Sequence, residues 1–254
     1  MTDYPGFLVT REGSTSIVTF DRPEARNALT TTMRKDFALL FRELDDDDEV
    51  RAVVLTGSDP SFTAGVDLKE RLAGSAPLPL VRPNPGEVLR SFGKPVICAV
   101  NGPCVTGGLE IALSCTFVLA SERAEFKDTH ARLGIMPGWG LSALLPRAVG
   151  SRVAAEMALT GRVVDAHEAL RLCLVNAVVT HDELVPAARE RATLIAGADG
   201  GAVRAVIALY RRGDGATLEE ALVYEREAAD AWRTDAASSL ERLSNVTGKD
   251  RTEK

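Results

Sequence analysis

The spacing of apolar residues predicts strands and strand–helix units in the first half of the chain. Two short segments within residues 7–20, FLVT and SIVTF, are typical of paired strands. Residues 28–47 place apolar side chains at helical spacing, and Thr30 is a suitable N-cap for that helix. Continuous apolar runs at residues 51–57 and 94–102 predict buried strands that end in glycine and lead into helices.

The second half of the chain has a predominantly helical pattern from about residue 138. After a short strand near residues 175–179, the pattern predicts three further helices, over roughly residues 181–196, 201–212 and 217–245. Such terminal helices either cover the sheet or form a subunit interface, and the pattern is compatible with both. Residues 74–86 hold four prolines and two glycines, so we expect a loop there.

Composition and charge narrow the class of protein. The 254 residues allow one large domain or two small ones. The net charge of −6 argues against nucleic-acid binding. No charge-free run approaches the ~20 residues that span a bilayer, and the N-terminus lacks the basic and apolar segments of a signal peptide. Nucleic acid and membrane are therefore not expected partners.

The cysteines and histidines do not have the spacing of a metal site. The four cysteines form no C-x-x-C pair, and the three histidines form no H-x-x-x-H pair. Cysteine in apolar surroundings acts as a small hydrophobic residue. We therefore expect no metal, no disulfide framework, and a reducing, cytoplasmic location.

Two glycines, Gly65 and Gly107, follow buried-type strands and precede helices. Glycine permits backbone conformations closed to other residues and lets another group approach closely. The first N–H groups of a helix lack internal partners. Two such turns that face one point would offer two N–H donors to a developing oxyanion. The alternative is that both glycines only make tight turns.

Glu110 lies three residues beyond Gly107, on the same helix face. Its neighbours, Leu109, Ile111, Ala112 and Leu113, are apolar. A carboxylate is seldom buried without a partner or a purpose, and a positioned carboxylate suits general acid–base work. The alternative is a glutamate that points to water from an amphipathic helix.

Several motifs together resemble the crotonase, or enoyl-CoA hydratase/isomerase, family over roughly residues 10–245. The longest of them is KPVICAVNGPCVTGGLEIAL, residues 94–113. The others are RPEARNAL (22–29), FTAGVDLKE (62–70), LGIMPGWG (133–140) and residues 155–179. No G-x-G-x-x-G follows a first strand, which argues against a nucleotide-dependent dehydrogenase.

The resemblance implies an α/β fold, a crotonase-like spiral of ββα units with a helical C-terminal trimerisation region. We place the spiral core at residues 1–195 and the trimerisation region at 196–254. The resemblance also implies a homotrimer or a dimer of trimers, a coenzyme A thioester as substrate, and no cofactor besides the coenzyme A of that substrate.

The resemblance further implies site residues. The backbone N–H groups of Val66 and Gly107 match the oxyanion hole, and Glu110 matches the first catalytic carboxylate of hydratases. The residues that match the coenzyme A and acyl-binding segments are Ala25, Arg26, Ala64, Gly65, Asp67 and Leu68. The loop 74–86 and the helix after residue 138 are expected to shape the acyl pocket, with Trp139 lining it.

The chain departs from the family pattern at His130, which stands where the second catalytic glutamate is expected. A neutral imidazole can accept a proton or orient water. His130 therefore either holds the attacking water while Glu110 moves the proton, or is a structural neighbour of a glutamate that acts alone. A third alternative is that Asp128, two residues earlier, takes the place of the missing acid.

The predicted reaction is the addition of water across the 2,3 double bond of an enoyl-CoA. The alternatives within the family are double-bond isomerisation, thioester hydrolysis and decarboxylation. A non-catalytic acyl-CoA-binding protein is the alternative outside enzymes, because one scaffold hosts many activities. The retained Glu110 and the two glycine turns favour an enzyme.

Overall fold

The computed structural model describes residues 2–73 and 80–233. The chain forms two compact units, Met1–Ile207 and Ala208–Lys254. The first unit contains every strand of the described residues, and helix α10 (Gly200–Gly213) crosses from it into the second. The proposed limits of a trimerisation region at 196–254 stay a prediction.

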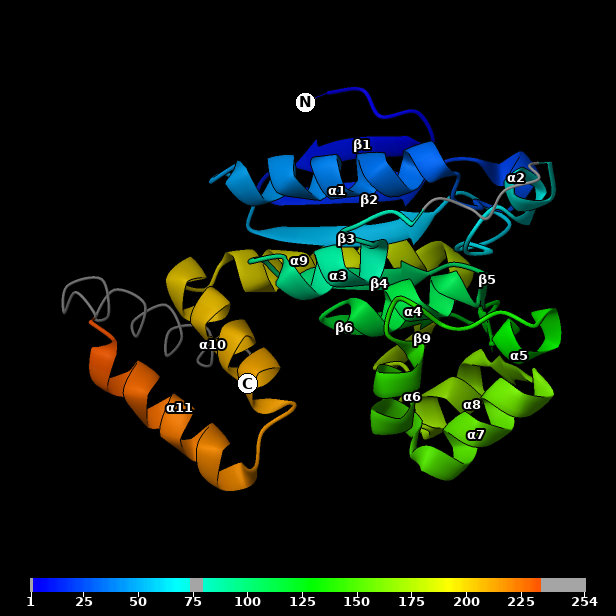
Figure 1. Ribbon diagram of the computed structural model, residues 1–254. Coiled ribbons are helices and arrows are strands. Elements are labelled where there is room, and N and C mark those ends of the chain that lie inside the picture. The colour runs from blue at the N-terminus through cyan, green and yellow to red at the C-terminus, as the bar shows by residue number, and fades with distance from the viewer. Residues whose placement is uncertain (1, 74–79, 234–254) are drawn as a thin grey trace, which may run out of the picture. The chain divides into compact units, whose positions relative to one another are not determined.

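A six-stranded sheet forms the centre of the first unit (Figure 1). Its order is β1-β2-β3-β4-β6-β9; β1 and β2 are antiparallel, and the remaining neighbours are parallel. The strands are β1 (Phe7–Glu12), β2 (Thr15–Phe20), β3 (Ala52–Gly57), β4 (Val96–Val100), β6 (Phe117–Ser121) and β9 (Ala177–Val179). A second, three-stranded sheet has the order β5-β7-β8, with β5 (Pro103–Val105), β7 (Glu125–Lys127) and β8 (Val163–Asp165).

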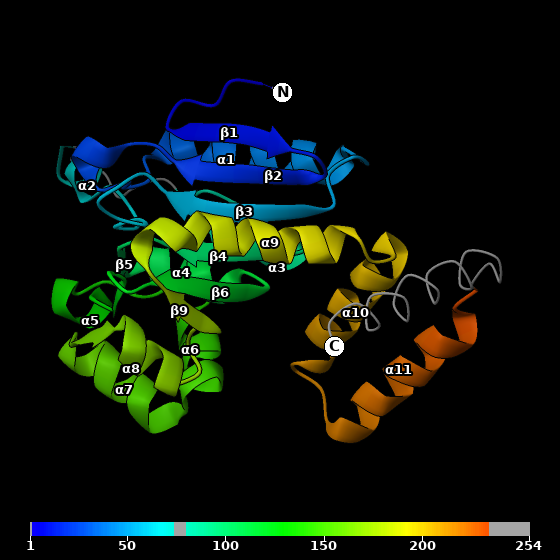
Figure 2. The ribbon, with the colours of Figure 1, turned by 180° about the vertical axis from the view of Figure 1, so that it is seen from behind.

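Helices cover both faces of the large sheet, which explains its continuous apolar strands. Along β3, Val53 and Leu55 belong to the core shared with the helices of one face, whereas Ala52 and Val54 belong to the core shared with α9. Figure 2 shows α9 lying across that second face. The helices of the first unit are α1 (Thr31–Asp46), α2 (Leu68–Ala73), α3 (Pro85–Ser91), α4 (Gly107–Ser114), α5 (His130–Leu133), α6 (Leu141–Val149), α7 (Ser151–Thr160), α8 (Ala166–Arg171) and α9 (Leu184–Ala196).

Most predicted elements are present, and the first helix begins as expected. The Thr30 hydroxyl accepts the Met33 N–H at 3.2 Å, which confirms the predicted N-cap of α1. The strands predicted within residues 7–20 are β1 and β2.

One helix boundary and two strands differ from the predictions. Pro85 and Gly86 were expected in a loop but open α3, because Asn84 and Glu87 form a capping box around a proline that suits the first helical turn. Residues 74–79 of that loop lie outside the described residues. β5 and β8 were not predicted, because three-residue strands carry too little alternation.

The last helix of the described residues, α11 (Leu218–Ala231), starts near the predicted place and ends at Ala231; the part of the prediction from residue 234 to 245 lies outside the described residues. Thr217 and Glu220 form its capping box. None of its residues is buried, and Leu218 and Leu222 are 77% and 55% exposed.

Among the described residues, no single helix is long and apolar enough to cross a membrane. One bent pair, His181–Ala196 with Gly200–Gly213, meets that test by length and composition only. The apolar face of α9 packs on the sheet through Leu184 and Ala188, which accounts for its composition.

Candidate active site

A cavity of about 430 Å³ opens where β5 turns into α4. Its walls come from that turn, from the segment that follows β3, from α1 and from the region around α5. The residues that line it are Arg34, Ala64, Val66, Leu68, Leu80, Val105, Thr106, Gly107, Glu110, Thr129, His130, Leu133, Ile135, Met136, Gly138 and Trp139. Trp139 lines this cavity, and its contact with an acyl group stays a prediction.

The two glycine turns meet at this cavity. Gly65 has φ +80°, and a Cβ placed on it would lie 2.8 Å from the backbone nitrogen of Gly107. A Cβ on Gly107 would lie 3.2 Å from the Cα of Gly65. Both the backbone conformation and the close approach therefore require glycine at residue 65.

The two backbone N–H groups beside this contact are those of Val66 and Gly107. Gly107 is the first residue of α4, so its N–H has no acceptor within the helix. Within residues 2–73 and 80–233, neither N–H has a hydrogen-bond acceptor. The arrangement can accept one anionic oxygen, as an oxyanion hole does.

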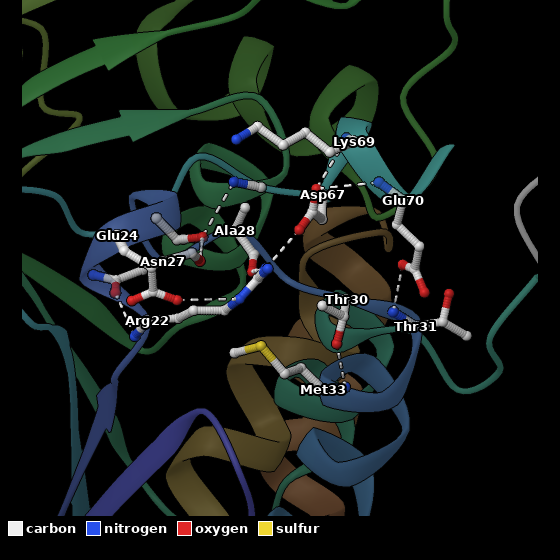
Figure 3. A network of polar contacts seen from close by, with 12 residues as sticks. Arg22, Glu24, Asn27, Ala28, Thr30, Thr31, Met33, Asp67, Lys69 and Glu70 are labelled. Carbon is white, nitrogen blue, oxygen red and sulfur yellow. Dashed lines mark hydrogen bonds and ion pairs between the residues drawn. The ribbon is translucent and has the colours of Figure 1, made fainter. Parts of the chain in front are cut away.

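A polar network holds the Val66 segment in place (Figure 3). Leu29 N–H donates to the Gly65 carbonyl at 2.7 Å, and Asp67 N–H donates to the Leu29 carbonyl at 3.0 Å. The Arg22 guanidinium lies 2.5 Å from an Asp67 carboxylate oxygen. Asp67 also accepts the Lys69 N–H at 2.9 Å, at the start of α2. The two residues on either side of Val66 are thus anchored.

These contacts also determine the pKa of Asp67. Burial alone would raise it, but the Arg22 guanidinium and the N–H groups at the start of α2 outweigh burial and lower the pKa of this carboxyl group. Asp67 is buried, with 5% of the residue exposed.

Glu110 is buried, being 2% exposed. Its Oε1 accepts the backbone N–H groups of Trp139 at 2.7 Å and Leu141 at 3.2 Å. The alternative of a glutamate that points to water is therefore wrong. Two N–H donors hold one carboxylate oxygen and leave the other, Oε2, available at the cavity.

The positively charged Arg90 is linked to the Glu110 helix through hydrogen bonds. The Arg90 guanidinium donates to the Trp139 carbonyl at 2.6 Å and to the Ser114 hydroxyl at 3.0 Å. That hydroxyl donates in turn to the Glu110 carbonyl at 2.8 Å. Burial lowers the pKa of Arg90, and the negative charge of Glu110 opposes this effect. Arg90 thus ties the Trp139 peptide to the helix that carries Glu110.

His130 completes the polar side of the cavity and is 6% exposed. Its Nδ1 lies 2.7 Å from Asp128 Oδ1, and its backbone N–H donates to the same oxygen at 3.0 Å. Its Nε2 lies 3.7 Å from Glu110 Oε2. A carboxylate only accepts hydrogen bonds, so Nδ1 carries the proton and the Nε2 of a neutral ring is an acceptor.

The location of Asp128 argues against its acting as a substitute acid. It is 1% exposed and lies outside the cavity lining, with the imidazole as its partner. Asp128 therefore orients His130, and His130 faces Glu110.

Comparison with known proteins places this geometry in a family. The sequence model for enoyl-CoA hydratase/isomerase matches residues 10–241. The chain belongs to the enoyl-CoA hydratase/isomerase family. The family assignment made from the sequence motifs is confirmed.

Its relatives in the enoyl-CoA hydratase/isomerase family match nearly the whole chain. A probable peroxisomal enoyl-CoA hydratase 1 of Arabidopsis thaliana is 38% identical over 223 residues, covering 87% of this chain and 83% of that protein. The short-chain-enoyl-CoA hydratase of Clostridium acetobutylicum is 37% identical and covers 87% of each. The crystal structure of enoyl-CoA hydratase from Mycobacterium tuberculosis H37Rv has a TM-score of 0.75 at 42% identity, with 89% of this chain and 98% of that chain covered. The predicted crotonase-like α/β fold is confirmed.

Of the residues predicted to bind coenzyme A, Ala64 and Leu68 line the cavity. Gly65, Ala25 and Arg26 do not, and Asp67 points to Arg22. Arg26 is exposed at φ 51°, and its carbonyl accepts the Ala64 N–H at 3.0 Å. These coenzyme A contacts stay predictions.

Sequence reasoning missed four contributors to the site of this family member. Two of them, the N–H groups of Trp139 and Leu141, are backbone donors, and backbone donors cannot be identified from residue type. Arg90 and Arg34 are the other two, and Arg34 is 5% exposed. Arg34 lies on the face of α1 that carries Met33 and Phe37, so helical spacing was the signal that could have placed it near the interior.

Proposed function

We propose that this protein adds water to the 2,3 double bond of an enoyl-CoA thioester. The observation that carries the proposal is the meeting of Gly65 and Gly107 at a cavity lined by the buried Glu110. This combination offers two N–H donors for an oxygen and one carboxylate for proton transfer. Family membership and relatives that bear the name enoyl-CoA hydratase support the same reaction.

The thioester oxygen binds between the N–H groups of Val66 and Gly107. As water attacks C3, negative charge moves through C2 to this oxygen and forms an enolate. The donors are fixed before the reaction, so they stabilise this charge without reorganising. Largely apolar residues around the cavity, such as Leu68 and Ile135, accommodate the acyl group.

The water binds between His130 and Glu110. Their facing atoms, Nε2 and Oε2, are 3.7 Å apart, too far for a direct hydrogen bond. Both are acceptors when His130 is neutral, so a water bridging them donates one O–H to each. Its oxygen lone pair is then left to attack C3.

Glu110 moves the proton. Its carboxylate takes a proton from the attacking water, so that hydroxide adds to C3 and the enolate forms. The protonated Glu110 then gives this proton to C2 as the enolate collapses to the thioester. The product contains the substrate and one water, and Glu110 is regenerated as a carboxylate; no cofactor enters this sequence.

The test is loss of enoyl-thioester absorbance with purified protein, for wild type and Glu110→Gln. Removing the proton-transfer group lowers kcat by about 10²–10⁴. Glu49→Gln, a surface carboxamide substitution, is the control and retains the wild-type rate, because Glu49 is 84% exposed. Wild type and Glu110→Gln that are equally slow on enoyl-CoA esters of every chain length would refute the proposal.

Product mass identifies the reaction. Hydration adds one water to the substrate, isomerisation leaves the mass unchanged, and thioester hydrolysis releases coenzyme A. Loss of carbon dioxide would indicate decarboxylation. Tight binding of the ester without any product would indicate a non-catalytic acyl-CoA-binding protein.

We also propose that the protein is a homotrimer or a dimer of trimers. In α11, Leu218 and Leu222 are exposed, and such apolar surface is typical of an interface between subunits. Light scattering on the wild type tests for three or six copies. Leu218→Asp with Leu222→Asp should reduce the mass, whereas Glu225→Gln on the same helix should not. A wild-type mass of one copy would refute this proposal.

The cytoplasmic location stays a prediction.

A further inference from the structure

Thr106, the residue between β5 and α4, has an unusual backbone conformation for its side chain. Its φ is 54° and its ψ is −104°. A β-branched residue rarely adopts positive φ, and such outliers persist only where the surrounding structure holds them. A strained strand-to-helix turn can serve to project a side chain into an active site. Thr106 lines the cavity, which points to a functional reason for the outlier.

The Thr106 hydroxyl binds the residue directly before His130. Its Oγ1 lies 2.5 Å from the hydroxyl oxygen of Thr129 and accepts the Thr129 N–H at 3.1 Å. The next N–H along the chain, that of His130, donates to Asp128. Two successive peptide groups at the start of α5 are therefore held by side chains.

The backbone of Thr106 contacts the other two groups of the site. Its carbonyl accepts the Glu110 N–H at 3.1 Å, and its peptide bond carries the N–H of Gly107. Its own N–H donates to the Lys127 carbonyl at 2.8 Å, one residue before Asp128. Thr106 is thus connected to the oxyanion donor, the carboxylate and the imidazole.

We propose that Thr106 is a positioning residue whose hydroxyl holds Thr129, and through it His130, at the distance from Glu110 that one water bridges. The proposal rests on the hydration reaction proposed above. The strained turn aims the hydroxyl at the start of α5, where a relaxed backbone would turn it elsewhere. Without the hydroxyl, the start of α5 is held less firmly, the imidazole shifts relative to Glu110 although Asp128 still orients it, and the water is less well aligned with C3.

Four single variants test the proposal. Thr106→Ala should lower kcat by about tenfold, near the upper value for one neutral hydrogen bond, with KM changed less than about twofold because the thioester donors remain. Thr106→Ser keeps the hydroxyl and should retain most of kcat. Thr106→Gly relieves the backbone strain at positive φ, so it should melt at a higher temperature than Thr106→Ala. Its kcat should be as low as that of Thr106→Ala, because the hydroxyl is absent from both. Thr129→Val removes the hydroxyl contact but keeps the backbone N–H that donates to Thr106, so it should lower kcat less than Thr106→Ala does.

A control and a double-mutant cycle separate positioning from stability. Thr56→Ala removes another buried threonine hydroxyl, which donates to the Ala99 carbonyl at 2.8 Å, and should leave kcat unchanged. In a His130→Ala background, Thr106→Ala should change kcat by less than about twofold, because the group it positions is gone.

Three outcomes would overturn the proposal: wild-type kcat in Thr106→Ala, recovery of kcat in Thr106→Gly, or an undiminished tenfold loss in the His130→Ala background. The last outcome would mean that Thr106 acts through Gly107 or Glu110. An active wild type with an inactive Glu110→Gln and an unaffected Thr106→Ala refutes this inference alone. A wild type as slow as Glu110→Gln refutes the hydration reaction itself.

Discussion

Replacing Gly65 with alanine tests the contact on which the oxyanion hole depends. At φ +80° an L side chain is strained, at about 1–2 kcal/mol for a left-handed residue. In addition, the new Cβ would lie 2.8 Å from the Gly107 nitrogen and 3.1 Å from its Cα. Both neighbours are backbone atoms, so the turn itself must move, and the two N–H donors separate.

Loss of one such donor lowers the rate by about 10²–10³, which is about 2.7–4 kcal/mol in the activation free energy. We therefore expect kcat/KM of Gly65→Ala to fall by at least about 10² in the enoyl-thioester absorbance assay. We also expect Gly65→Ala to melt below the wild type, since strain and the clash both destabilise it.

Gly150→Ala is the matched control. Gly150 has φ +81°, and a Cβ there has nothing within 4 Å, so the substitution adds strain without a clash. With ψ 152° this conformation is one that only glycine adopts readily, and a strain of about 1–3 kcal/mol lowers the melting temperature of a chain of this size by roughly 2–12 °C. Its kcat/KM should stay at the wild-type value. Full activity in Gly65→Ala, or an equal loss of activity in Gly150→Ala, would refute the reasoning.

Two further substitutions test the groups behind the site. Asp128→Ala removes the oxygen that accepts both the Nδ1 proton and the backbone N–H of His130, so the ring tautomer is no longer fixed; kcat should fall by on the order of 10², and an unchanged kcat would contradict the bridging water. Asp67→Asn should destabilise the fold at pH 7 by about 1.5–3 kcal/mol, because Arg22 loses a charged acceptor. Folding lowers the pKa of Asp67. Its ionised carboxylate therefore stabilises the fold fully above the pKa of the unfolded chain, near 3.9, and this stabilisation is lost as the pH falls through the pKa of the folded protein. Urea unfolding at pH 7 and pH 3 should show the difference between wild type and Asp67→Asn shrinking at low pH; a constant difference would contradict this linkage.

The predictions that succeeded rest on strong local signals. Thr30 was identified as an N-cap because threonine before a run of helical spacing satisfies a backbone N–H. The runs that became β3 and β4 are continuously apolar because both faces of the parallel strands are covered. Family motifs then led to Val66, Gly107 and Glu110 as the candidate site.

The errors occurred where local signals are weak or compete. β5 is three residues long, which is too short to show the alternation of apolar and polar residues that identifies a strand. It also precedes a pair of glycines, which is typical of a turn. Pro85 was assigned to a loop because proline usually interrupts structure, although proline at the first helical turn is favourable. Each error comes from a residue whose preference depends on its exact place in an element.

The sequence by itself determined the order of elements, the apolar faces, the family, and the residue types at the two glycine turns. These follow from side-chain periodicity and from motifs that are contiguous in the chain. The sequence also raised the question of His130 and left three answers open for the histidine, its neighbour Asp128 and Glu110.

Only the tertiary structure decided which groups meet. Residues 65 and 107 come together because a parallel bridge between Thr63 and Cys104 places the segment after β3 beside β5. Folding also aims Asp128 at His130, Trp139 N–H at Glu110, and the Thr106 hydroxyl at Thr129. Such contacts join residues that are distant in the chain or depend on backbone dihedral angles. They cannot be predicted from the spacing of apolar residues or from residue type.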